Sequence, residues 1–218
     1  MPRRVDHDER RRQITDACRR VVARDGLEAA TFQAVAAEAG VSVRLVQYYF
    51  GHKHGLLVAT HRAVVEDSAA RFGGGGPAGA GENAEAPPPR AVLRAVLAAL
   101  LPLDDDRRAD AVVLAAFHAA ALTNEAVTPE ELRGAPRVLV DLVAAQLLRA
   151  RGGDAGPDPE DAHLARLDAE LVLASAAGLT QGVLAGHVTG ETALAVVDRL
   201  LDRLVPTGVS GTSSAPAS

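Results

Sequence analysis

The chain has 218 residues, 48% of them apolar, which is enough to bury a sizeable core as one large domain or two smaller ones. Its single cysteine, Cys18, excludes an internal disulfide framework. The net charge of −5 argues at first against a nucleic-acid partner, but residues 1–62 carry 11 Lys/Arg against 7 Asp/Glu and the remainder carries 12 against 21. A basic N-terminal segment followed by an acidic remainder is the asymmetry expected of a protein whose N-terminal part binds phosphates.

Alanine and leucine dominate the composition, and long alternating runs of β-branched residues are absent, so we expect an all-helical fold. A first helix is predicted from Asp8 to Asp25, because apolar residues recur on one stripe at helical spacing and Gly26 can end the helix. Cys18 lies on that stripe, which predicts a core residue rather than a reactive thiol.

Two short helices and a longer one follow. Thr31 can cap a helix over Phe32–Ala39, and Ser42 can cap a second over Val43–Phe50. Between them Gly40 provides the tight turn, because glycine adopts positive φ without steric cost. A further helix is predicted from Lys53 to about Phe72.

The segment Gly73–Pro89, rich in glycine and proline, predicts a flexible loop, since neither residue supports a helix. Helical patterns then resume, at Arg90–Leu101, Asp104–Thr123, Pro129–Arg151, Pro159–His187 and Glu191–Val205. The small, polar tail 206–218 is expected to be disordered. The longest strongly apolar stretch, Ala111–Leu122, is shorter than the roughly 20 residues of a membrane span, and we expect a cytoplasmic protein.

The second and third helices have the pattern of a helix-turn-helix. Val35, Val41, Val46 and Phe50 are placed to fill the core between them, which leaves the opposite face of the second helix of the pair for DNA. On that face lie Val43, Arg44, Gln47 and Tyr48. Glutamine and arginine can bond adenine and guanine edges, and apolar groups can touch thymine methyls. Tyr49 and Lys53 lie beside this face and can contact phosphates, as can the helix N-terminus at Thr31.

The stretch TFQAVAAEAGVSVRLVQYYFGHKHGLL resembles the DNA-binding segment of the tetracycline-repressor (TetR) family of bacterial transcription regulators. The matching positions are Thr31, the turn Ala39-Gly40-Val41-Ser42, the pair Tyr49-Phe50, and Lys53, and the resemblance covers roughly residues 10–60. It departs at Gln47, where the family commonly has a tyrosine, and at Leu45, where a small polar residue is common. The resemblance implies DNA contacts by the residues above and by Gln33.

The resemblance also implies a division into a helix-turn-helix domain (1–55) and a C-terminal helical bundle (56–205) that binds a small effector and forms a homodimer. The residues of the last two helices support dimerisation. The predicted helix Pro159–His187 carries a stripe of large and then small residues, whose spacings of three and four permit close helix packing: Leu164, Leu167, Leu171, Ala174, Gly178, Gly182 and Ala185. Alternatively, these stripes pack only within one protomer.

Polar residues amid apolar helices are the candidates for an effector pocket. They are His118, Gln146, Gln181 and Thr180, together with Phe117, the only aromatic residue after Phe72. A lone histidine on an apolar helix is more often structural than ligand-binding. The scarcity of aromatic rings favours an aliphatic effector over a flat aromatic one.

Sequence signatures of enzymes are absent. Neither GxxxxGK[ST] nor GxGxxG occurs in a strand-turn-helix pattern, because the glycine run Gly73–Gly76 has neither a preceding strand nor a following lysine. No HExxH or cysteine-based metal spacing is present, so we expect no catalysis, no metal and no cofactor. The run Asp104–Asp106 is explained by the preference of helix starts for acidic residues. The function expected is therefore a ligand-responsive, sequence-specific regulator that binds double-stranded operator DNA and acts as a repressor. A DNA-binding architectural protein with no effector remains the alternative.

Overall fold

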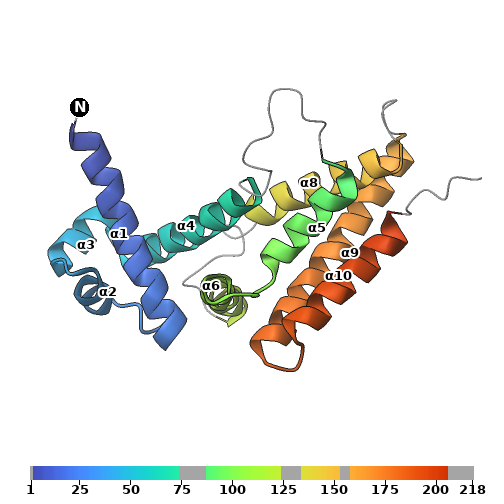
Figure 1. Cartoon of the computed structure of the whole chain (residues 1–218). Coiled ribbons are helices and arrows are strands. Elements are labelled where there is room, and N and C mark those ends of the chain that lie inside the picture. Colours follow the sequence, from blue (N-terminus) through green and yellow to red (C-terminus); the bar gives the residue numbers. More distant parts are fainter. Residues whose placement is uncertain (1, 74–86, 124–133, 153–157, 206–218) are drawn as a thin grey trace, which may run out of the picture.

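A computed structural model describes residues 2–73, 87–123, 134–152 and 158–205, and within these ranges all regular structure is helical (Figure 1). The predicted all-α class is confirmed. The helices are α1 (Pro2–Asp25), α2 (Phe32–Ala39), α3 (Val43–Phe50), α4 (Lys53–Gly73), α5 (Pro89–Leu100), α6 (Asp105–Thr123), α8 (Gly134–Ala150), α9 (Pro159–Leu184) and α10 (Gly190–Leu204). Most of the predicted loop Gly73–Pro89, the tail 206–218 and the predicted helix start at Pro129 lie outside the described residues.

The bounds of α2 and α3 agree with the prediction because local capping sets them. The Thr31 hydroxyl accepts the Ala34 N–H at 3.1 Å, and the Ser42 hydroxyl accepts the Leu45 N–H at 3.2 Å. Each bond satisfies one of the N–H groups that a helix start leaves without a partner. Gly40 has φ 66°, the left-handed conformation that the tight turn requires.

The start of α4 has a cap that the sequence did not reveal. The imidazole Nδ1 of His52 accepts the Gly55 N–H at 3.0 Å. Gly55 is itself constrained, because a Cβ at this position would lie 2.5 Å from the carbonyl oxygen of Phe50. The turn from α3 into α4 is therefore fixed by a ring nitrogen and by a close backbone contact.

The buried apolar residues form two separate cores. The N-terminal core joins α1, α2, α3 and α4, and it also takes in three residues of α6: Val113, Phe117 and Ala120. The second core joins α5, α8, α9 and α10. Cys18 is fully buried in the N-terminal core, as expected, and burial raises the pKa of its thiol to about 11. In Figure 1, α6 lies between α4 and the bundle of α5, α9 and α10.

Helix α9 keeps a large apolar surface exposed. By length and composition it alone among the described helices could cross a membrane, with a mean hydropathy of 1.2 over its most apolar window, of which 22% is buried. Its exposed leucines form a stripe at spacings of three and four that smaller residues and one glutamine continue, namely Leu164, Leu167, Leu171, Ala174, Gly178 and Gln181. Gly182, in contrast, is buried, and a Cβ there would lie 2.7 Å from Val188 within the same protomer.

Replacing Gly55 by alanine tests the α3–α4 turn. Helix propensity alone would stabilise the alanine variant by up to about 1 kcal/mol. The contact with the Phe50 carbonyl instead predicts a net loss of about 1–3 kcal/mol, the usual cost of overpacking. Thermal unfolding followed by circular dichroism measures the change in stability. Ala70→Gly, at an exposed site of α4, gives the contribution of helix propensity alone. An unchanged or raised melting temperature would contradict the geometry.

Candidate nucleic-acid interface

Helix α3 turns its apolar side inward and its polar side to solvent. Val46 is fully buried and Phe50 nearly so, and Val35 of α2 packs in the same core. On the opposite side Val43 is 37% exposed and Tyr48 75% exposed, and Arg44 and Gln47 are also exposed. The predicted orientation of the helix is confirmed, and the four side chains form one continuous outer face.

Helix α1 holds α3 in place from behind. The Arg11 guanidinium donates to the carbonyl oxygen of Tyr49 at 3.1 Å and lies 4.7 Å from the centre of the Phe50 ring. The Gln13 amide donates to the carbonyl oxygen of Ala39 at 2.9 Å, at the end of α2. Because these bonds engage the C-terminal ends of α2 and α3, the outer face of α3 is presented on a fixed support.

The two tyrosines occupy different environments, as adjacent residues of a helix must. Tyr49 is half-buried and packs against the N-terminal core, and its ring centre lies 4.6 Å from that of His7. The Tyr48 ring stands edge-on to it at 5.4 Å and projects into solvent. Tyr48 therefore belongs to the outer face, whereas Tyr49 lies at the margin between that face and the core.

The remaining predicted DNA contacts surround this face. Thr31 and Gln33 are exposed at the start of α2. The Lys53 ammonium donates to the carbonyl oxygen of Glu28 at 3.2 Å and lies 3.6 Å from the carboxylate of the same residue. Lys53 thus fastens the α1–α2 loop to α4, a role that the sequence did not indicate. An ammonium has three donors, so this bond leaves capacity for a phosphate.

The residues predicted to line an effector pocket lie in unlike surroundings. Phe117 is fully buried in the N-terminal core, with its ring centre 5.2 Å from that of His61 on α4. His118 and Gln181 are exposed, and Gln146 is half-buried and accepts a hydrogen bond from Arg149. Burial and the neighbouring His118 lower the pKa of His61 to about 4, so the ring joining α4 to α6 is neutral near pH 7.

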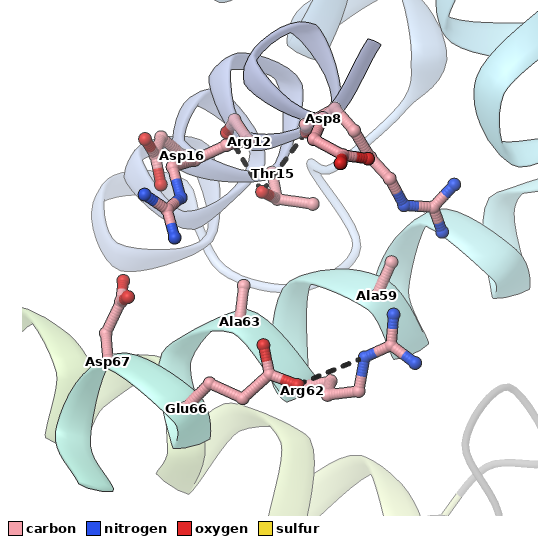
Figure 2. Close-up of a pocket in the computed structure, with 10 residues that line it drawn as sticks. Asp8, Arg12, Thr15, Asp16, Ala59, Arg62, Ala63, Glu66 and Asp67 are labelled. Carbon is pink, nitrogen blue, oxygen red and sulfur yellow. Dashed lines mark hydrogen bonds and ion pairs between the residues drawn. The ribbon is translucent and has the colours of Figure 1, made fainter. Parts of the chain in front are cut away.

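A polar cleft of about 160 Å³ opens between α1 and α4. Figure 2 shows Thr15 and Asp16 on α1 facing Ala63 and Asp67 on α4 across it. Burial raises the pKa of Asp16, and the negative charge of Asp67 adds to that effect. Across the described ranges no three His, Cys, Asp or Glu side chains are grouped as a metal site would need.

These features define a helix-turn-helix regulator, and comparison with known proteins agrees. Residues 14–60 match the family model of bacterial regulatory proteins of the tetR family. Residues 89–206, more than half of the chain, match that of the C-terminal part of BetI-type transcriptional repressors. The chain belongs to the TetR family, as the residues of the helix-turn-helix predicted.

Individual relatives match mainly through the N-terminal part. The regulator PksA of Bacillus subtilis is 38% identical over 66 residues, 30% of this chain and 32% of PksA. The regulator BetI of Vibrio atlanticus is 42% identical over 65 residues, 30% of this chain and 32% of BetI. The chain thus spans about a third of the length of the curated relatives it matches.

Solved structures match over nearly the whole chain. A transcriptional regulator from Rhodococcus sp. Rha1 has a TM-score of 0.71 at 27% identity, over 89% of this chain and 95% of that protein. A protein from Saccharomonospora viridis, crystallised with choline, has a TM-score of 0.72 at 19% identity, over 89% of this chain and 96% of its own. At that lower identity the likeness concerns the fold.

The exposure of Tyr48 predicts a separation of stability from binding. Tyr48→Ala removes a side chain that packs little in the free protein, so the free energy of unfolding should change by less than about 0.5 kcal/mol. Operator affinity should fall about tenfold, the size of one lost base-edge contact. Phe50→Ala, two residues on, is the contrast and should cost about 3–5 kcal/mol of stability. A strongly destabilised Tyr48→Ala protein would show that the ring is part of the core.

Proposed function

We propose that the protein is a ligand-responsive repressor that binds operator DNA as a homodimer through helix α3. The observation that carries this proposal is the outer face of α3, where Arg44, Gln47 and Tyr48 are exposed on a helix that is capped and supported from behind. The match of the C-terminal part to BetI-type transcriptional repressors supports the sense of regulation. We place the protein in the cytoplasm, with DNA binding rather than catalysis as its activity.

The side chains of the outer face have distinct chemical roles in this proposal. Arg44 and Gln47 read base edges in the major groove, because a guanidinium matches guanine and an amide matches adenine in two-point hydrogen bonds. Val43 and the Tyr48 ring contact thymine methyl groups. Thr31, Gln33, Tyr49 and Lys53 bind the phosphates on either side and so set the register of the helix on the duplex.

A second copy of the chain would cover the exposed stripe of α9. Leu164, Leu167 and Leu171 are each about half exposed, at 47%, 53% and 54%, and small residues continue the same stripe toward the C-terminal end of the helix. Val196 of α10 is exposed as well. In a symmetric dimer the two copies of α9 and α10 form a four-helix bundle, which removes this surface from water. The domain division at residues 55/56 and the end of the bundle at 205 are part of this proposal.

The dimer gives the regulatory mechanism its geometry. Two recognition helices reach successive major grooves only when they are about 34–36 Å apart. An effector that binds better to a dimer with another spacing draws the population away from DNA, and the size of the shift is set by that difference in affinity. Helix α4 connects the DNA-binding part to the bundle and serves as the lever.

We propose an aliphatic effector, with Phe117, His118, Gln146 and Gln181 as the candidates for its contacts, although Phe117 is buried in the N-terminal core and Gln181 also lies on the exposed α9 stripe. The relative from Saccharomonospora viridis holds choline, but sites for quaternary ammonium groups are commonly cages of several aromatic rings. After Phe72 this sequence contains a single aromatic residue, Phe117, whose ring is buried beside His61. Thermal-shift measurements with choline and with a panel of aliphatic acids and amines compare the two chemistries directly.

The experiment that tests DNA reading combines genome-wide mapping of bound sites with Gln47→Ala. The variant should lose about 1–3 kcal/mol on the preferred operator and should accept other bases at one or two positions. Glu66→Gln, a change at an exposed position of α4 away from the outer face, is the control and should keep the sequence preference. A uniform loss of affinity on all sequences would make Gln47 a phosphate contact. Failure of the wild-type protein to enrich any site would refute the function.

The dimer surface is tested by Leu171→Glu, which places a charge in the middle of the α9 stripe. Burying an unpaired carboxylate costs several kcal/mol, so the variant should be monomeric in sedimentation equilibrium at concentrations where the wild type is dimeric. Leu122→Glu is the matched control, since Leu122 is 88% exposed on α6 and lies off the stripe. A dimeric Leu171→Glu protein would rule out this face as the interface.

A further inference from the structure

Helix α6 packs against the N-terminal core although α5, a helix of the second core, separates it from α4 in the chain. Val113 and Phe117 are fully buried among residues of α1 and α4. The helix contacts α1 and α4 more extensively than α5 and α9. The mechanical division of the molecule therefore runs between α6 and the bundle of α5, α8, α9 and α10.

A buried carboxylate strengthens this attachment. The Asp110 side chain, on the N-terminal half of α6, is 4% exposed and forms ion pairs with Arg19 of α1 and with Arg71 of α4, the latter at 2.5 Å. Asp67 of α4 lies 3.7 Å from the same Arg19 guanidinium, and Figure 2 shows Asp67 facing α1 across the cleft. Two positive charges from two helices thus converge on one buried negative charge from a third.

The bundle side of α6 is held more weakly. In the same first turns of α6, Arg107 donates to the carbonyl oxygen of Ala98 on α5 at 3.1 Å, and Arg108 donates to that of Leu184 on α9 at 3.3 Å. Both are hydrogen bonds to backbone oxygens at helix ends, and the Arg108 bond is exposed. A relative movement of the two cores would break these bonds before it broke the buried ion pairs.

Helix α1 extends from this ion pair to the recognition helix. Arg19 meets Asp110, and eight residues earlier Arg11 donates to the Tyr49 carbonyl oxygen on α3. On one continuous helix that separation is about 12 Å. The carboxylate on α6 and the recognition helix are therefore attached to a single rigid element.

We propose that Asp110 is a positioning residue for DNA binding: by pairing with Arg19 and Arg71 it makes α6 part of the DNA-binding body. A ligand that shifts α6 relative to the bundle then reorients α3 directly, through α1, as well as through the lever α4. The regulatory consequence rests on the proposed function, whereas the attachment itself concerns only the folded chain.

Hydrogen exchange measured by mass spectrometry on the full-length protein tests the attachment. Asp110→Asn keeps the size of the side chain and removes the carboxylate that the half-buried Arg19 and Arg71 share. Exchange in α6 and in α1–α3 should accelerate together by about tenfold or more, while α9 and α10 keep their wild-type rates. Acceleration in α6 together with α9 and α10, with α1–α3 unchanged, would place Asp110 in the bundle and overturn the proposal, as would no change anywhere.

Asp198→Asn is the control for the other body, because Asp198 of α10 pairs with Arg94 of α5 at 2.7 Å at the surface of the bundle. It should accelerate exchange in α5 and α10 and leave α1–α3 unchanged. Should Asp110→Asn fail to fold, Arg71→Gln gives the same comparison, since Arg71 is 35% exposed and Arg19 stays paired. Both tyrosines lie in α3, so tyrosine fluorescence during urea unfolding reports the DNA-binding body separately.

Operator affinity separates positioning from stability. At a temperature where both variants are folded, loss of a residue that only stabilises the fold would leave this affinity unchanged. Asp110→Asn should bind the operator about tenfold more weakly, within the usual range of coupling between sites, and Asp198→Asn should stay within about twofold of the wild type. Equal affinity of Asp110→Asn and wild type would remove the positioning role. If the wild type binds no operator, the proposed function fails while the exchange experiment still decides the attachment.

Discussion

Burial of Val46 and Phe50 beneath α3 decides which side chains this protein can present to DNA. An eight-residue helix with two inward positions four residues apart has its outer face determined by the 100° turn per residue, and that face contains Arg44, Gln47 and Tyr48. Burying two apolar side chains of this size is worth about 1.5–3 kcal/mol each, more than any exposed polar contact on the helix would return. The orientation of α3 about its own axis is therefore fixed already in the free protein.

Local interactions explain why the helix-turn-helix could be predicted to the residue. Thr31, Ser42 and Gly40 act within three or four positions of their own place in the chain, so their effect is visible in the sequence. The outward direction of Arg44 and Gln47 follows from the same short-range geometry. The exposed stripe on α9 was also visible as a pattern, although Gln181 rather than Gly182 continues it, because Gly182 packs against Val188.

Interactions between segments far apart in the chain could not be predicted from the sequence. The sequence placed α6 in the C-terminal bundle by chain order, and only tertiary packing shows Phe117 in the N-terminal core. Lys53 was assigned to phosphate from its position in the motif, and its bond to the Glu28 carbonyl spans 25 residues. Candidates for the effector site were chosen for polarity amid apolar neighbours. That criterion cannot separate an exposed residue such as Gln181 from one that faces a cavity.

In the folded chain, several of the positive charges of the N-terminal segment are paired with carboxylates. Its excess of arginine suggested a surface that attracts phosphates, yet Arg20 and Arg24 both bind Glu38, and Arg19 binds Asp110. Several arginines of the N-terminal segment thus hold helices together, and paired arginines contribute little to the electrostatic field that reaches DNA. With a net charge of −9 on the rest of the chain, long-range attraction to DNA is weak. In the proposed complex, short-range contacts therefore matter most, and hydrogen-bond geometry on the outer face of α3, rather than charge, distinguishes one sequence from another.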